Sequence, residues 1–332
     1  MIDASRRELS RRHALLGITS LTLGALAAPH IAEAQATPVA ATPGAGAFPV
    51  TITHINGETI IPARPERIVA ASDFLDLDAL LTLGLTPVAY GAANGATGQR
   101  LPWQDAAEGI PTFDAATDLD LEAITAAQPD LIITMPKYFD DWYETLSAIA
   151  PTVVIDWDDP WRDALRMVGR ATGEEARADA EVARAEALIA DARAAMAPAA
   201  EMPLMVGFMY TTELWIWGED MSAGQLFREL GLDFVGGEDP VMTVVSLEQA
   251  DQLRPAQILL SAMTDPDAIA KQEASPIFQS LPAVKRGGYG LLTIDQTSAL
   301  ADSVSPLSLA WALPGFVDLI LQLAAGEGKL LP

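Results

Sequence analysis

A long helical stretch divides the chain into two regions of similar organisation. From Trp161 to Met196 the sequence contains hardly anything but helix-forming residues. Thr172 and Glu175 have the Thr-x-x-Glu spacing of a capping box, which predicts a helix start near Gly173. Apolar residues then recur at alternating spacings of three and four, which is the stripe of an amphipathic helix: Val182, Ala185, Ile189, Ala192 and Met196.

Both flanking regions alternate short apolar runs with helical spacings. "RIVAAS", "TPVAYG", "DLIITM" and "TVVIDW" are typical of buried strands before the long helix, and "LMVGFMY", "LWIWG", "QILLSAM" and "YGLLTI" follow it. This order favours an α/β fold with two lobes, each a mostly parallel sheet flanked by helices, joined by a single long α-helix. We expect the N-terminal lobe over residues 48–160, the linking segment over 161–198 and the C-terminal lobe over 199–332.

One short unit occurs once in each lobe. "DLEAITAAQPDLIITM" begins at Asp120 and "SLEQADQLRPAQILLSAM" begins at Ser246. Both have Leu-Glu, then six residues, then Pro and an apolar run, which predicts a helix that ends before a strand. Glu122 and Glu248 hold the same place in the two copies.

The N-terminus has the residue order of an export signal. Two arginine pairs, at 6–7 and 11–12, precede an apolar run over residues 14–28 and small residues up to Ala34. The run is shorter than the roughly 20 residues that span a bilayer. The Ser-Arg-Arg contexts favour the twin-arginine route over an ordinary secretory signal. We expect a signal over 1–34 and a flexible tether over 35–47, whose Ala, Pro, Gly and Thr do not support a core.

The composition excludes several kinds of chemistry. The chain contains no cysteine, so we expect neither disulfides nor a lipid anchor through cysteine. Without residues 1–34, 16 basic and 42 acidic residues remain, a formal charge of −26, which disfavours nucleic acid as a partner. A single histidine beyond the signal, His54, cannot build a typical zinc site. No nucleophile elbow and no phosphate-binding loop occurs.

Aspartates cluster at two places in the chain. Asp73, Asp76 and Asp78 form one group, and Asp156, Asp158 and Asp159 form the other. A pair of carboxylates can perform general acid–base catalysis. In a chain this acidic, solvated loop acids and helix caps explain them better.

Five motifs in order resemble one known family. "RPERIVAASDFLDLDALLTLGLTPVAYG", "DLDLEAITAAQPDLIITM", "LWIWGEDMSAGQLFRELGLDFVG", "VVSLEQADQLRPAQILL" and "SPIFQSLPAVKRGGYGLL" are similar to segments of the substrate-binding proteins of ABC importers for ferric siderophores, haem and cobalamin. The resemblance covers about residues 48–325. It implies two α/β lobes linked by one helix, export to the periplasm or extracytoplasmic space, and no enzymatic activity or resident cofactor.

The resemblance also implies a role for the repeated glutamates. In the family, one glutamate on each lobe docks into arginine pockets of the membrane permease dimer, and Glu122 and Glu248 occupy the corresponding motifs. A two-fold permease offers two equivalent basic pockets to a two-lobed, monomeric partner. The alternative is that each glutamate only favours the first turn of its helix.

Ligands of α/β sheets bind at the carboxyl ends of strands, so we expect the site in the cleft between the lobes. Polar and aromatic residues stand near such ends or are expected to face the cleft. The candidates are Asp73, Phe74, Asn94, Trp103, Lys137, Tyr138, Trp157, Tyr210, Met242 and Met263. Burial of these residues in the core between sheet and helices is the alternative for each.

The expected ligand is an iron complex, with a ferric siderophore as first choice. Hydroxamate-siderophore binders that resemble this chain carry an arginine where Ala116 stands, and an aromatic pair where Asp295–Thr297 stand. An anionic complex would need a cation such as Lys137 or Arg100. The alternatives are a cobalamin or haem binder of the same importer type, and an exported enzyme that uses the acids of residues 156–159.

Overall fold

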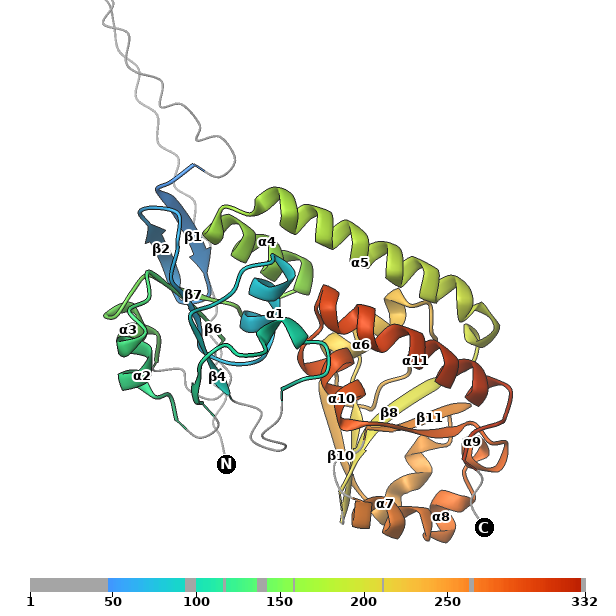
Figure 1. Cartoon of the computed structure of the whole chain (residues 1–332). Coiled ribbons are helices and arrows are strands. Elements are labelled where there is room, and N and C mark those ends of the chain that lie inside the picture. Colours follow the sequence, from blue (N-terminus) through green and yellow to red (C-terminus); the bar gives the residue numbers. More distant parts are fainter. Residues whose placement is uncertain are drawn as a thin grey trace, which may run out of the picture. The chain divides into compact units, whose positions relative to one another are not determined.

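The computed structural model describes residues 47–92, 100–115, 118–135, 142–157, 159–210, 212–262 and 266–329. All of them belong to one compact unit. The expected signal and all but the last residue of the expected tether lie outside the described residues. Figure 1 shows two α/β lobes joined by a long helix, so the expected fold class is confirmed.

The N-terminal lobe is built on a parallel five-stranded sheet with the order β5-β4-β3-β6-β7. An antiparallel hairpin, which sequence patterns did not predict, precedes it, and short helices cover the sheet. The bounds are β1 Val50–His54, β2 Gly57–Ile61, β3 Ile68–Ala70, α1 Leu75–Thr82, β4 Ala89–Ala92, η1 Asp105–Ala107, β5 Thr112–Asp114, α2 Leu121–Ala126, β6 Leu131–Thr134, α3 Trp142–Ser147 and β7 Thr152–Val154.

The C-terminal lobe repeats this plan with the strand order β10-β9-β8-β11-β12. The bounds are β8 Leu204–Met209, β9 Glu213–Trp217, α6 Ser222–Glu229, β10 Met242–Ser246, η3 Leu247–Leu253, β11 Ile258–Ala262, α7 Pro266–Glu273, α8 Pro276–Gln279, α9 Pro282–Lys285, β12 Tyr289–Leu292, α10 Ile294–Thr297, η4 Ser298–Asp302 and α11 Pro306–Ala324.

The second sheet is less parallel than the sequence predicts. β9 pairs antiparallel with both β8 and β10, whereas β8, β11 and β12 are parallel. The physical reason is the connection: only residues 210–212 separate β8 from β9, and so short a link can join only antiparallel strands.

The repeated Leu-Glu units occupy equivalent places in the two sheets. The strands that follow them, β6 and β11, each lie between the first strand of their lobe's parallel segment and the edge strand, in the orders β3-β6-β7 and β8-β11-β12. The first unit begins the α-helix α2, as expected, but the second begins the 3₁₀ helix η3, in which Gln249 has non-helical angles. The repeat is therefore a shared structural position rather than an identical helix.

The linking segment consists of two helices, α4 (Trp161–Thr172) and α5 (Glu175–Ala195), followed by the turn η2 (Ala197–Ala199). All five predicted stripe residues of the long helix are buried. The predicted capping box is wrong. The Thr172 hydroxyl donates back to the carbonyls of Val168 and Gly169 because Thr172 closes α4, and Gly173 ends that helix with a left-handed φ of 74°.

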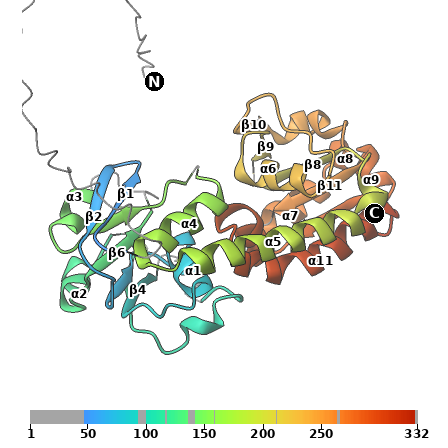
Figure 2. The same ribbon diagram turned by 90° about the horizontal axis from the view of Figure 1, so that it is seen from above.

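The lobes also contact each other directly. Leu101 and Trp103 of the N-terminal lobe pack into the same hydrophobic cluster as α11, β8 and β11 of the C-terminal lobe. Figure 2 shows α11 running beside α5. Among the described helices, α11 is long and apolar enough to cross a membrane by length and composition, but Leu309, Leu313 and Phe316 place its apolar side in this cluster.

The close approach of β4 to β3 depends on Gly91. A Cβ atom at residue 91 would overlap the carbonyl oxygen of Ala71 and lie 2.7 Å from the Cβ of Ala115. We expect Gly91→Ala to lower the free energy of unfolding by about 1–3 kcal/mol, because backbone atoms cannot move aside at no cost.

Gly315 in α11 is the matched control for this substitution. A Cβ there meets only Gln296 Nε2, at 3.7 Å. Because alanine favours a helix over glycine, Gly315→Ala should maintain or raise stability, by up to about 1 kcal/mol. Urea unfolding followed by tryptophan fluorescence measures both variants, and equal losses of stability would contradict this account of β4.

Candidate ligand-binding site between the lobes

A cavity of about 250 Å³ lies between the two lobes. The N-terminal lobe contributes α1 and the connection from β7 into α4, and the C-terminal lobe contributes α6, the residue before β10, and η4. The lining residues are Leu75, Trp157, Asp159, Pro160, Trp161, Arg162, Asp220, Ser222, Gln225, Leu226, Glu229, Val241, Ala301, Asp302 and Val304.

The local sequence explains why the connection after β7 enters the cavity. Strand β7 ends at Val154, and the chain then turns at Asp156–Asp159, where the Asp159 carboxylate accepts a hydrogen bond from the backbone N–H of Asp156 at 3.1 Å. Pro160 starts α4 without a side-chain cap. Trp157 and Trp161 are therefore carried to the edge where strands of the parallel sheet end, and the interaction of Asp159 identifies it as a residue that shapes the loop.

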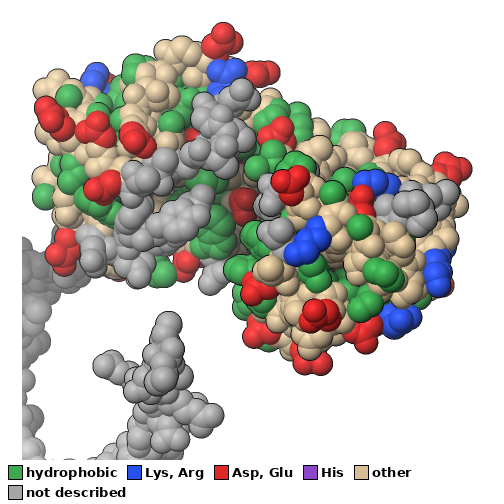
Figure 3. Space-filling view, turned by 90° about the horizontal axis from the view of Figure 1, so that it is seen from below, with side chains coloured by type: hydrophobic (Ala, Val, Ile, Leu, Met, Phe, Trp, Pro, Cys, Tyr) green, Lys and Arg blue, Asp and Glu red, His purple; other side chains and the backbone are tan. Residues whose placement is uncertain are grey.

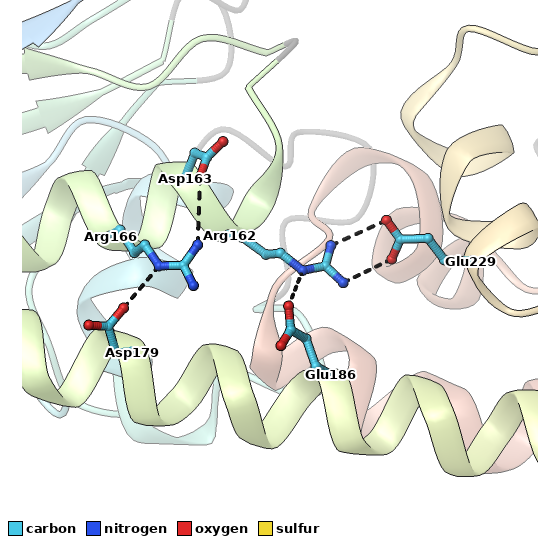
Figure 4. A network of polar contacts seen from close by, with 6 residues as sticks. All are labelled: Arg162, Asp163, Arg166, Asp179, Glu186 and Glu229. Carbon is cyan, nitrogen blue, oxygen red and sulfur yellow. Dashed lines mark hydrogen bonds and ion pairs between the residues drawn. The ribbon is translucent and has the colours of Figure 1, made fainter.

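An arginine network connects the lobes beside the cavity (Figure 4). Arg162 of α4 donates to Glu229 of α6 at 3.0 and 3.3 Å and to Glu186 of α5 at 2.8 Å. Its guanidinium lies 4.4 Å from the centre of the Trp161 ring. Burial opposes the charge of Arg162, but the hydrogen bonds to the two glutamates outweigh burial and raise the pKa of the guanidinium.

A second polar link between the lobes is fully buried. The Asp78 carboxylate on α1 accepts hydrogen bonds from Trp103 Nε1 at 2.8 Å, Gln104 Nε2 at 2.7 Å and Ser305 Oγ at 2.7 Å. Ser305 belongs to the C-terminal lobe and caps α11. Burial raises the pKa of Asp78 to about 6, although the three donors act in the opposite direction.

The neighbouring acids are also buried, so the interpretation of this group as solvated loop acids is wrong, although Asp76 and Asp78 do lie in the first turn of helix α1. Asp76 accepts hydrogen bonds from the backbone N–H and the hydroxyl of Ser72, each at 2.6 Å. Burial raises the pKa of Asp76 to about 7 against the effect of those bonds. Asp73 is 4% exposed, and its charge contributes to the raised pKa of both acids and of Tyr90. Helix α1 thus contributes polar groups to the interior of the molecule.

The described site candidates of the N-terminal lobe differ in position. Trp157 lines the cavity and is half-buried. Phe74 packs in the lobe's hydrophobic core. Trp103 lies at the junction of the two lobes. Its N–H donates to Asp78, and its ring centre lies 5.4 Å from that of Trp311.

The remaining candidates do not line the cavity or lie outside the described residues. Tyr210 directly follows β8, with its ring centre 5.0 Å from that of Trp215. Met242 does not follow a strand, because it begins β10 opposite Trp217 and adjoins the lining residue Val241. Asn94, Lys137, Tyr138 and Met263 lie outside the described residues.

Both repeated glutamates are exposed, Glu122 in the first turn of α2 and Glu248 in the first turn of η3. Helix η3 packs beside α8. Figure 1 shows α2 and α8 on the sides of their lobes away from α5.

Sequence patterns missed most of the residues that line the cavity. Trp161 and Arg162 stand at the start of the long helical stretch. A helix explains both residues as well as a binding site does. Asp220 stands two residues after the predicted strand "LWIWG" but was not recognised, and Ser222 and Asp302 come from segments with no strand-end signal. The adjacent aromatic and cationic pair Trp161–Arg162, at the first turn of the linking segment, was the available signal. Among the described residues, no group of three His, Cys, Asp or Glu side chains is placed to hold a metal ion.

A cavity with aromatic walls between two α/β lobes defines a protein that binds a small molecule. Residues 69–288 match the sequence profile of the periplasmic binding protein family, so the chain belongs to this family.

Curated relatives and solved structures agree with this assignment. The chain is 27% identical over 260 residues to the putative ABC transporter substrate-binding lipoprotein YhfQ of Bacillus subtilis, which covers 72% of this chain and 79% of the relative. It is 26% identical over 306 residues to the ferric enterobactin-binding periplasmic protein FepB of Escherichia coli, with 82% and 88% covered. The structure of Streptococcus pneumoniae PiaA in complex with ferrichrome has a TM-score of 0.69 at 22% identity, with 84% and 100% covered.

The buried carboxyls of α1 predict how stability depends on pH. Because their pKa values are raised in the folded chain, the folded state binds more protons than the unfolded state. Their stabilising contribution to the free energy of unfolding is complete below about pH 4 and is lost as the pH rises through about 6 to 7. Each group loses up to about 1.4 kcal/mol per pH unit in this range.

Asp76→Asn should remove part of this pH dependence. The Ser72 hydroxyl can rotate to accept from the new amide, so the variant should gain stability relative to the wild type between pH 4.5 and 7.5. Asp191→Asn, at an exposed position of α5, is the control. Its stability should change with pH in the same way as that of the wild type. Urea unfolding across this pH range measures the difference, and parallel profiles for all three proteins would refute the proton linkage.

Proposed function

We propose that the protein is the extracytoplasmic substrate-binding component of an ABC importer, and that it captures a ferric siderophore between its lobes and delivers it to a membrane permease. The observation that carries this proposal is the inter-lobe cavity with Trp157 and Trp161 in its lining, in a chain of the periplasmic binding protein family. Aromatic faces suit large complexes with apolar rims. FepB is named as a ferric enterobactin-binding protein, and PiaA has a structure in complex with ferrichrome. Both support iron complexes as the ligand class.

The proposal includes export and a monomeric protein without catalytic activity. The arginine pairs ahead of an apolar run support export by the twin-arginine route. YhfQ is named a lipoprotein, whereas this chain has no cysteine to carry a lipid, so export without that anchor is part of the proposal.

Ligand binding is tested by tryptophan fluorescence. Ferric siderophores, haem and cobalamin are titrated separately, and we expect saturable quenching by a ferric siderophore without any product. Trp157→Phe should reduce the quenching and weaken binding by roughly tenfold, because this ring lines the cavity.

Trp142→Phe on α3 is the matched control, since Trp142 does not line the cavity, and should bind like the wild type. Saturation by haem or cobalamin instead would reassign the ligand. Turnover of an added compound that disappears in a variant of residues 156–159 would establish an enzyme.

Delivery to the permease is tested by charge reversal on the two lobes. Glu122 and Glu248 are exposed and begin the two equivalent units, which supports a role in docking to two basic pockets. We expect Glu122→Lys and Glu248→Lys each to lower cellular uptake of radioactive iron by at least about tenfold, with ligand affinity unchanged.

Glu144→Lys and Glu201→Lys make the same charge change at exposed positions of the two lobes and should preserve uptake. Normal uptake by both Glu122→Lys and Glu248→Lys would eliminate the docking role and leave ligand binding intact.

A further inference from the structure

The lining of the inter-lobe cavity is strongly acidic. Asp159, Asp220, Glu229 and Asp302 line it, and Arg162 is the cation among the described lining residues. Figure 3 shows acidic side chains on both sides of the hollow between the lobes. Carboxylates in a partly enclosed space act on a bound charge more strongly than they do in bulk water.

The arginine of the cavity is already neutralised. Arg162 forms hydrogen bonds with both Glu229 and Glu186, and its flat face lies on Trp161. Two carboxylates therefore face one guanidinium. The hydrogen bonds to them use three of the five guanidinium N–H groups, and the two glutamates already outweigh the charge of Arg162, so an anionic ligand would gain little net attraction from it.

Arg100, the described cation that could have served an anionic complex, also pairs with a carboxylate. Arg100 pairs with Asp105 at 3.5 Å and does not line the cavity. The charge of Arg100 lowers the pKa of Tyr90, whereas the charge of Asp73 raises it. Arg100 therefore does not change the acidic balance of the lining residues.

We propose, on the basis of the proposed function, that the cargo is a ferric complex without net negative charge, such as a tris-hydroxamate bound without the arginine that hydroxamate binders carry where Ala116 stands. Three hydroxamates neutralise the ferric ion, and a protonated amine on the chelator makes the complex cationic. Three catecholates leave the complex strongly anionic. The acidic lining attracts the cationic complex, tolerates the neutral one and repels the anionic one, while the tryptophan faces contact the organic frame and attract an ammonium group.

Three probes of different charge test the proposal: ferrioxamine B, which is cationic, ferrichrome, which is neutral, and ferric enterobactin, which is strongly anionic. Binding to the full mature chain is followed by tryptophan fluorescence at low and high salt. We expect affinity to fall in the order given, and added salt to weaken the binding of ferrioxamine B most, since salt screens charge attraction.

The acids are tested by the double variant Asp220→Asn/Asp302→Asn. It should weaken the binding of ferrioxamine B by on the order of tenfold and change that of ferrichrome by less than about threefold. Asp191→Asn/Glu201→Gln removes the same number of carboxylates at exposed positions outside the cavity and should bind all three probes like the wild type.

The outcomes separate this inference from the proposed function. Tightest binding of ferric enterobactin, or equal loss of ferrioxamine B affinity in both double variants, overturns the charge preference and leaves a siderophore-binding protein. Failure of all three ferric complexes to bind overturns the proposed function and the charge preference with it.

Discussion

The structure depends on a buried carboxylate at the junction of its lobes. Asp78 accepts hydrogen bonds from Trp103 and Gln104 of its own lobe and from Ser305, the residue that caps α11 of the other lobe. A carboxylate without these donors would be costly to bury, so each partner maintains the position of the others. Trp103 and Leu101 also belong to the hydrophobic cluster that forms the core of the C-terminal lobe.

This junction and the Arg162 network together define the cavity. The junction holds α1 against the start of α11, and Arg162 connects α4 to α5 and α6. The cavity lies between elements that are tied at both places, so a change in the angle between the lobes would have to break buried or charge-assisted contacts. A site with restrained walls loses little free energy to ordering when a ligand binds.

Much of the fold was predictable from the sequence because its signals are local and periodic. The stripe from Val182 to Met196 identifies the buried side of α5, and the Leu-Glu units identify the corresponding strands β6 and β11. The antiparallel pairing of β9 was not predictable from its apolar run, since that pattern does not specify strand direction. The burial of Asp76 and Asp78 was missed because composition alone made exposed acids the better explanation.

The site was less predictable because its residues meet across the two lobes. Trp157 was identified since it follows a strand, whereas Trp161, Arg162 and Asp302 acquire their roles only when α4, α6 and η4 come together. Trp103 satisfied the same rule as Trp157 but serves the junction. Residue type at a strand end therefore indicates a position near the site, and tertiary contacts decide between binding and support.

The most direct measurement is anomalous X-ray diffraction at the iron edge from crystals grown with a ferric siderophore. The account predicts one iron peak between the lobes, beside Trp157 of the N-terminal lobe and the start of α6 in the C-terminal lobe. An iron peak on the outer surface of either lobe, with no ligand density in the cavity, would contradict it.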